Sequence, residues 1–166
     1  MAKILATDLD GTLFYPKDNI GMISKPNLFF IQSFIDNGGK VVLISGRSHS
    51  YIKKVINRIG RPCAGISYNG GCVYDGEKLV RSKAIPNDEA NEIIEEIKNT
   101  YKIPGIFLMT ENGLSIYLRY KSKFIRWLYK LYYKTTGIYA ENLLSNEEDY
   151  YKELKEGKIF KIMIKL

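Results

Sequence analysis

Short apolar runs alternate with amphipathic segments along the first half of the chain. Residues 3–7, 41–44 and 64–68 are continuous apolar runs of strand length, each followed by polar or glycine residues. Between them, apolar residues recur every three to four positions over residues 26–39 and 49–60. Strand, helix, strand, helix, strand at this spacing predicts βαβ units and a parallel sheet. Because the strands are apolar throughout, we expect both faces of that sheet to be covered.

The pattern changes after the third run. Turn signals at residues 75–76 and 111–113, each between short apolar stretches, predict two hairpins. Helical spacing predicts helices over residues 87–100, with Asn87 as the cap, and over 122–135. Strict alternation predicts a strand over residues 158–166. This half has the pattern of an α+β domain.

We therefore expect two domains, an α/β part over residues 1–83 and a smaller α+β part over residues 84–166. At 45% apolar and 26% charged residues, the 166-residue chain has the composition of a globular protein. The N-terminus does not resemble a signal peptide, and no apolar stretch reaches the roughly 18 residues that span a membrane. The sequence predicts a cytoplasmic protein without a membrane partner.

The net charge of +7 makes nucleic acid a partner to consider. The excess lies in residues 1–83, where Lys53, Lys54, Arg58 and Arg61 occupy the polar positions of a predicted helix. A solvated helix face explains them without a nucleic acid, and a basic surface also suits small phosphorylated ligands. The basic and aromatic residues of 121–134 fit a membrane-surface or nucleic-acid helix, but packing within the second domain explains them better.

Polar side chains follow all three apolar runs. Asp8 and Asp10 follow the first, Ser45 and Arg47 the second, and Asn69 the third. Ligands of open parallel sheets bind beyond the carboxyl ends of the strands, where these loops converge. We therefore expect a functional site at this edge of the sheet.

Asp8 and Asp10 form the most informative pair. Two carboxylates one residue apart suit a hard divalent ion such as Mg²⁺, which would join them to a substrate phosphate. One carboxylate could then attack phosphorus while the other handles the proton of the leaving group. The alternative is that Asp10 and Gly11 only form a turn and that Asp8 is a helix-cap or surface acid.

Three segments together resemble a known family. Asp8–Leu13 (DLDGTL) resembles the first motif of the haloacid dehalogenase superfamily. Residues 41–47 (VVLISGR) and 66–71 (ISYNGG) are similar to the second motif and the third-strand signature of its Cof-type sugar-phosphatase branch. The resemblance implies a Rossmann-like parallel sheet core with an inserted α+β cap, and hydrolysis of small phosphorylated metabolites such as sugar phosphates.

The resemblance also implies residue roles. Asp8 would be the nucleophile that forms an aspartyl-phosphate, and Asp10 would be the general acid and then the base. Mg²⁺ would be held by Asp8 and Asp10, with the backbone carbonyl of Asp10 as a ligand. Ser45 would donate a hydrogen bond to the phosphoryl group. The substrate-binding residues would be Thr12, Arg47 and Asn69, although Arg47 and Asn69 could equally be structural.

One departure from the family is large. Members carry a lysine in a third motif and an acidic pair after a Gly-Asp dipeptide, and this chain has no such dipeptide. We expect the sequence to be an N-terminal portion with weak or no activity by itself. The alternative function is an inactive remnant that folds or binds ligand without turnover. A cap that ends on the strand 158–166 also predicts a homodimer through the cap strands.

Overall fold

The computed structural model describes residues 3–15, 23–101, 105–118, 143–144 and 147–165, together with positions 124, 127–128 and 131. The chain divides into two compact units, Met1–Ser82 and Lys83–Leu166. The assignment of the first unit as a catalytic core and of the second as a cap stays a prediction.

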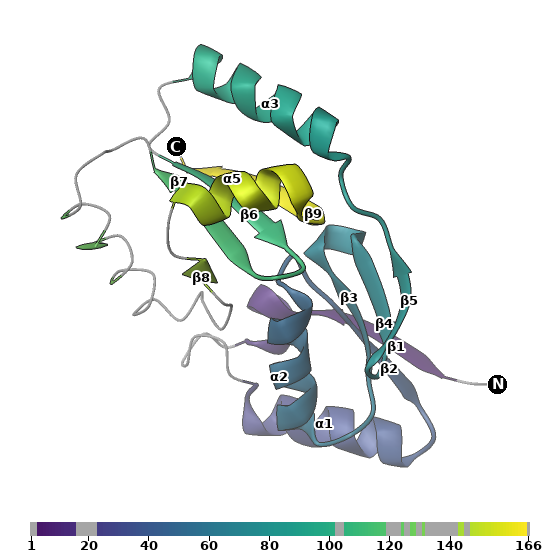
Figure 1. The fold of residues 1–166 in the computed structure, drawn as a ribbon. Helices are drawn as coiled ribbons and strands as arrows, with labels where there is room; N and C mark the ends of the chain where they lie inside the picture. The colour runs from purple at the N-terminus through teal and green to yellow at the C-terminus, as the bar shows by residue number, and fades with distance from the viewer. Residues whose placement is uncertain are drawn as a thin grey trace. The chain divides into compact units, whose positions relative to one another are not determined.

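The first unit contains a mixed five-stranded sheet in the order β1-β2-β3-β4-β5 (Figure 1). Its first three strands are parallel, and the last two run antiparallel as a hairpin. The predicted α/β fold class is confirmed. The strands are β1 (Ile4–Asp8), β2 (Lys40–Ile44), β3 (Ala64–Ser67), β4 (Cys72–Asp75) and β5 (Lys78–Ser82).

Helices α1 (Lys25–Asp36) and α2 (His49–Ile59) lie on the same face of this sheet (Figure 1). The strand order advances in one direction from β1 to β3, so two right-handed crossovers place both helices on one side. The two helices contact each other, and the Gln32 side-chain amide donates to the Ile59 carbonyl at 2.8 Å.

The prediction that both faces of the sheet are covered is wrong for the described residues. Val41 and Leu43 of β2 point toward the helices and are 1% and 0% exposed. On the opposite face, Ile4 is 66% exposed and Ile44 is 37% exposed. The apolar strands do indicate two apolar faces, but both crossovers cover the same one.

The second unit contains a four-stranded sheet in the order β8-β7-β6-β9. Its strands are β6 (Gly105–Thr110), β7 (Leu114–Leu118), β8 (Leu143–Leu144) and β9 (Ile159–Lys165), and its helices are α3 (Asn87–Thr100) and α5 (Glu147–Glu156). The sequence did not predict β8 or α5, and most of the helix predicted over 122–135 lies outside the described residues. The core consists of Ala90, Ile94, Ile106, Leu108, Tyr150, Leu154 and Ile159.

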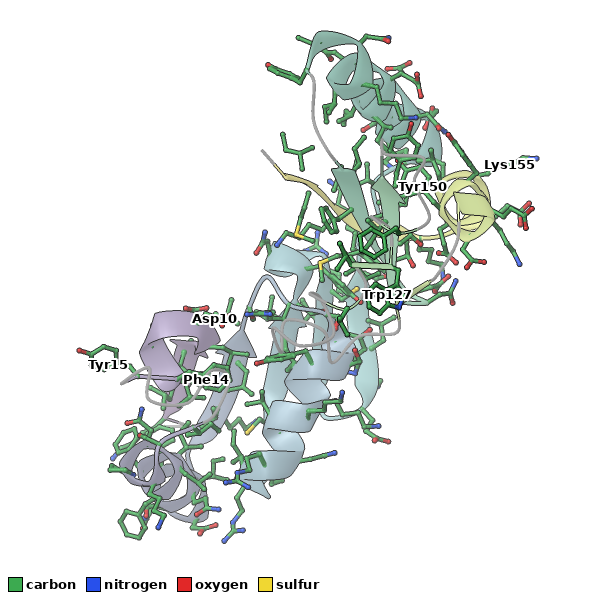
Figure 2. All side chains as sticks on the ribbon, turned by 90° about the vertical axis from the view of Figure 1, so that its left-hand side faces the viewer. Asp10, Phe14, Tyr15, Trp127, Tyr150 and Lys155 are labelled. Carbon is green, nitrogen blue, oxygen red and sulfur yellow. The ribbon has the colours of Figure 1, made fainter. Side chains whose placement is uncertain are left out.

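Helix α5 is anchored by one aromatic side chain and one amide. Figure 2 shows Tyr150 turned toward the sheet of this unit and Lys155 pointing away from it, and Tyr150 is fully buried. The side chain of Asn87 donates to the carbonyls of Leu154 and Gly157 at 2.9 and 3.0 Å. Asn87 therefore ties α3 to the end of α5, and the prediction that it caps α3 is wrong because the cap position falls on Pro86.

Strand β9 is the end strand of the described sheet and pairs antiparallel with β6. Association of two copies through this strand stays a prediction. Among the helices that the structure describes, none is long and apolar enough to cross a membrane.

Candidate active site

The carboxyl ends of the three parallel strands are aligned. Asp8 of β1 pairs in register with Ile44 of β2, which pairs in register with Ile66 of β3. The residues that follow these three positions therefore leave the sheet along the same edge. The strand order β1-β2-β3 places the loop after β2 between the other two.

The loop after β1 is a single turn over Leu9–Leu13, closed by a hydrogen bond from the Phe14 amide to the Leu9 carbonyl at 2.9 Å. Gly11 has φ = 88°, a conformation that favours glycine. Leu9, Leu13 and Phe14 are buried and anchor the turn. Figure 2 shows Phe14 directed into the first unit and Tyr15 directed outward. A rigid turn thus presents the two aspartates.

The two aspartates have different surroundings. The carboxylate of Asp8 is exposed and forms no hydrogen bond or ion pair with the residues that the structure describes. Asp10 is held by both oxygens: Nε of Arg47 donates to Oδ2 at 3.1 Å and Nη2 donates to Oδ1 at 3.0 Å. Although only Leu9 separates the two aspartates, the Asp8 carboxylate is open to a ligand and the Asp10 carboxylate is paired.

Arg47 is held at its backbone, and its guanidinium contacts a ring as well as Asp10. Its amide donates to Oγ of Ser45 at 3.2 Å, and its guanidinium carbon lies 5.0 Å from the centre of the Tyr51 ring. A guanidinium over a tyrosine face gains cation–π attraction. Burial raises the pKa of Tyr51, while the charge of Arg47 opposes that shift and the charge of Asp10 adds to it.

The loop after β3 contains two consecutive non-glycine residues in the left-handed region, Tyr68 at φ = 54° and Asn69 at φ = 57°. Their amides donate to the carbonyls of Arg47 at 3.0 Å and of Ser45 at 3.2 Å. Such backbone strain persists only where surrounding bonds impose it, and it clusters at functional sites. The loop after β3 is therefore locked onto the loop after β2.

The structure connects four of the six predicted site residues. The contacts above join Asp10, Ser45, Arg47 and Asn69. Asp8 at the end of β1 and Thr12 in the turn make no side-chain contact with these four within the described ranges. The buried Ser45 hydroxyl accepts from Arg47 and donates to no acceptor among those residues.

Sequence reasoning missed Tyr51 and the strained backbone at Tyr68. Arg47 lies before the cap of the helix that contains Tyr51, so no helical spacing rule predicts their contact. No sequence pattern signals a left-handed tyrosine, because that conformation is imposed by tertiary hydrogen bonds.

A family model described as haloacid dehalogenase-like hydrolase matches residues 5–166. The chain belongs to this family. The resemblance seen in the three sequence motifs is thereby confirmed for the haloacid dehalogenase-like hydrolases as a family, while the roles of individual residues stay predictions.

The chain is also similar in sequence to curated phosphatases and similar in fold to solved structures. Phosphatase YwpJ of Bacillus subtilis is 30% identical over 102 residues, which is 60% of this chain and 35% of the relative. TM0651 of Thermotoga maritima has a TM-score of 0.71 at 23% identity, covering 99% of this chain and 56% of the other. The subclass IIB sugar phosphatase BT4131 has a TM-score of 0.69 at 17% identity, covering 97% and 57%. The chain thus spans about a third of the length of the curated relatives it matches.

The donor atoms of this haloacid dehalogenase-like site suit Mg²⁺, which prefers oxygen ligands and keeps several waters. Asp8 offers an open carboxylate, and Asp10 follows it on a rigid turn. In the part of the chain that the structure describes, no group of three or more His, Cys, Asp or Glu side chains gathers around one point. The described residues therefore fit a Mg²⁺ ion held by few protein ligands and by water.

His49, the single histidine of the chain, begins α2 beside this site. Its ring stacks on Tyr74 with centroids 3.3 Å apart, and its Nδ1 is buried without a hydrogen-bond partner in the described structure. Burial lowers the pKa of His49, the charge of Lys53 lowers it further, and Glu77 opposes the shift. The stacking on Tyr74 gives His49 a packing role at the start of α2.

We expect the stability of the chain to decrease as the pH falls below the ordinary histidine pKa of 6.5. Because folding lowers the pKa of His49, the unfolded chain binds more protons in the window below this value. The stabilisation is complete above it and is lost as the pH falls through that window. The measurement is the urea midpoint at about pH 7.5 and about pH 5.5. His49→Phe keeps a stacked ring and should show a smaller decrease; an equal decrease would assign the effect to other groups.

Proposed function

We propose that the protein is a Mg²⁺-dependent phosphohydrolase that acts on small phosphorylated metabolites such as sugar phosphates through an aspartyl-phosphate. The observation that carries the proposal is the pairing at the strand ends: an open Asp8 carboxylate beside an Asp10 that Arg47 holds by both oxygens. Membership of the haloacid dehalogenase-like hydrolases and similarity to phosphatases support it.

The proposed reaction uses the two aspartates in turn. An oxygen of Asp8 attacks phosphorus, and the bond between phosphorus and the ester oxygen breaks. Asp10 donates a proton to that leaving oxygen and then takes a proton from a water molecule that attacks the aspartyl-phosphate. The second step releases inorganic phosphate and restores Asp8. Ser45 would donate its hydroxyl proton to a phosphoryl oxygen, and Thr12, Arg47 and Asn69 would line the substrate side.

Mg²⁺ would be held by the carboxylate of Asp8 and the backbone carbonyl of Asp10, with water as the remaining ligands. When bound, the ion would neutralise the charge of the carboxylates and the phosphoryl oxygens. Because few described groups hold the ion, we expect weak metal binding. Residues 1–166 also lack the lysine and the acidic pair that family members carry. Each electrostatic element of this kind contributes about 10²–10³ to the rate, so turnover by these residues should be low.

The substrate class rests on charge and on similarity. An excess of six positive charges in residues 1–83 favours small anions over neutral ligands. The sugar phosphatase BT4131 has the same fold, which supports a sugar phosphate as the substrate.

The proposal is tested by incubating the purified chain with p-nitrophenyl phosphate and, separately, with acetyl phosphate. We expect slow nitrophenol release that requires Mg²⁺ and stops on addition of a chelator, and a phosphate adduct on Asp8 by mass spectrometry. Release that persists without Mg²⁺ would contradict metal dependence. Phosphate binding with neither adduct nor release would favour the alternative, an inactive remnant.

A further inference from the structure

The pairing of Asp10 with Arg47 conflicts with the role proposed for Asp10. Both carboxylate oxygens accept from the guanidinium, at 3.1 and 3.0 Å. A carboxyl group that hands a proton to a leaving oxygen needs one oxygen facing that atom. The pairing engages one lone pair on each oxygen of Asp10 and fixes the plane of the carboxyl group against Arg47, so release from Arg47 would let Asp10 turn toward the leaving oxygen.

The surroundings of the pair allow the guanidinium to turn while the backbone stays in place. The backbone of Arg47 is held on both sides, by its amide on Oγ of Ser45 and by its carbonyl accepting from Tyr68. The side chain of Arg47 is 23% exposed and that of Asp10 is 50% exposed, so part of each side chain reaches the solvent. Tyr51 offers the guanidinium a ring face that does not depend on Asp10.

A phosphate group competes directly for this guanidinium. Arginine forms bidentate hydrogen bonds with phosphate as readily as with carboxylate, and a phosphate dianion carries twice the charge. Asp8 ends β1 two positions before Asp10, so a phosphate bound at Asp8 would approach the pair that Arg47 forms with Asp10. The incoming anion and Asp10 are therefore alternative partners of one guanidinium.

We propose that Arg47 is a positioning residue that exchanges Asp10 for the substrate phosphate. Without ligand it holds Asp10 by both oxygens; with a phosphate monoester bound it turns to the phosphoryl oxygens and frees Asp10 for proton transfer. The inference rests on the proposed function and adds a coupling between substrate binding and release of the acid. Binding of the substrate phosphate and release of Asp10 from Arg47 then occur together.

The exchange is tested by titrating the isotope-labelled chain with inorganic phosphate in metal-free buffer and following the side-chain Nε–H signal of Arg47 by nuclear magnetic resonance. Sodium chloride at matched ionic strength is the control. We expect a saturable shift of the Arg47 signal with phosphate. In Asp10→Asn, phosphate should bind about tenfold tighter, because the anion no longer displaces a charged partner.

Two further variants separate exchange from simple loss of negative charge. Asp8→Asn removes the same charge without touching Arg47, so its gain in phosphate affinity should be clearly smaller. In an Arg47→Met background, Asp10→Asn should give no gain, with affinity read from the backbone amides of Gly46 and Gly70. Three results would overturn the exchange. The first is an equal gain in phosphate affinity in Asp8→Asn and Asp10→Asn. The others are a gain that persists without Arg47 and an Arg47 signal that does not respond to phosphate. These measurements involve no turnover, so a chain that shows the exchange but hydrolyses nothing would refute only the hydrolysis.

Discussion

Replacing Asp8 by asparagine should abolish phosphate-ester hydrolysis and leave only the background rate. The amide is neutral and lacks the negative charge that makes a carboxylate oxygen nucleophilic toward phosphorus. The Asp8 carboxylate forms no contact with other described residues, so the exchange of one oxygen for a nitrogen removes no structural bond. The measurement is Mg²⁺-dependent nitrophenol release together with the mass of the acetyl phosphate adduct.

Asp75→Asn is the matched control for this prediction. Asp75 also ends a strand of the first unit, is exposed, and carries the same charge, but it lies on β4 and away from the parallel strand ends. We expect it to retain the turnover of the natural chain and an unchanged thermal midpoint. If Asp8→Asn retains most of the turnover, or if both variants lose it equally, Asp8 is not the nucleophile.

The second large effect is on stability and concerns the contact through which α2 packs on the sheet. Ile52 is fully buried, and a Cβ placed on Gly65 of β3 would lie 2.9 Å from Cγ2 of Ile52. We expect Ile52→Ala to lower the free energy of unfolding by about 2–5 kcal/mol, because it leaves a cavity between helix and sheet. Gly65→Ala should cost about 1–3 kcal/mol, because the stiff β-branched side chain has little room to move.

The two substitutions should compensate each other when combined. In the double variant, the new methyl group at position 65 enters the space that Ile52 has left, so the loss is smaller than the sum of the two single losses. The measurement is urea unfolding of all four chains. Additive losses would show that Gly65 and Ile52 do not touch in solution. Because α2 begins just after Arg47, loss of the packing between Ile52 and Gly65 should also weaken phosphate binding.

The sequence determined the elements of the first unit because their signals are local. Uninterrupted apolar runs of strand length and three-to-four spacing between them predicted three strands and two helices close to their observed bounds. Gly11 after Asp10 predicted a turn, and the structure has a left-handed glycine there. Polar residues after each run predicted a shared edge, since parallel strands end on the same side of a sheet.

Elements of the second unit with weak local signals were missed. Helix α5 has a strongly polar sequence and is held by the burial of Tyr150 and Leu154, two contacts that depend on partners distant in the chain. The assignment of Asn87 as a cap failed for the same reason. Its amide satisfies the carbonyl groups at the end of another helix, and no pattern around position 87 encodes that partner.

Within the candidate site, the sequence alone determined which residues stand at the strand ends, and tertiary structure decided how they interact. The spacing of Asp8 and Asp10 is the same whether both are free or one is paired. Only the loop after β2, lying between its neighbours, brings Arg47 onto Asp10 and leaves Asp8 open. Residue type and order set the available chemistry, whereas an ion pair between positions 37 residues apart requires the folded backbone to bring its partners within 3.0 Å.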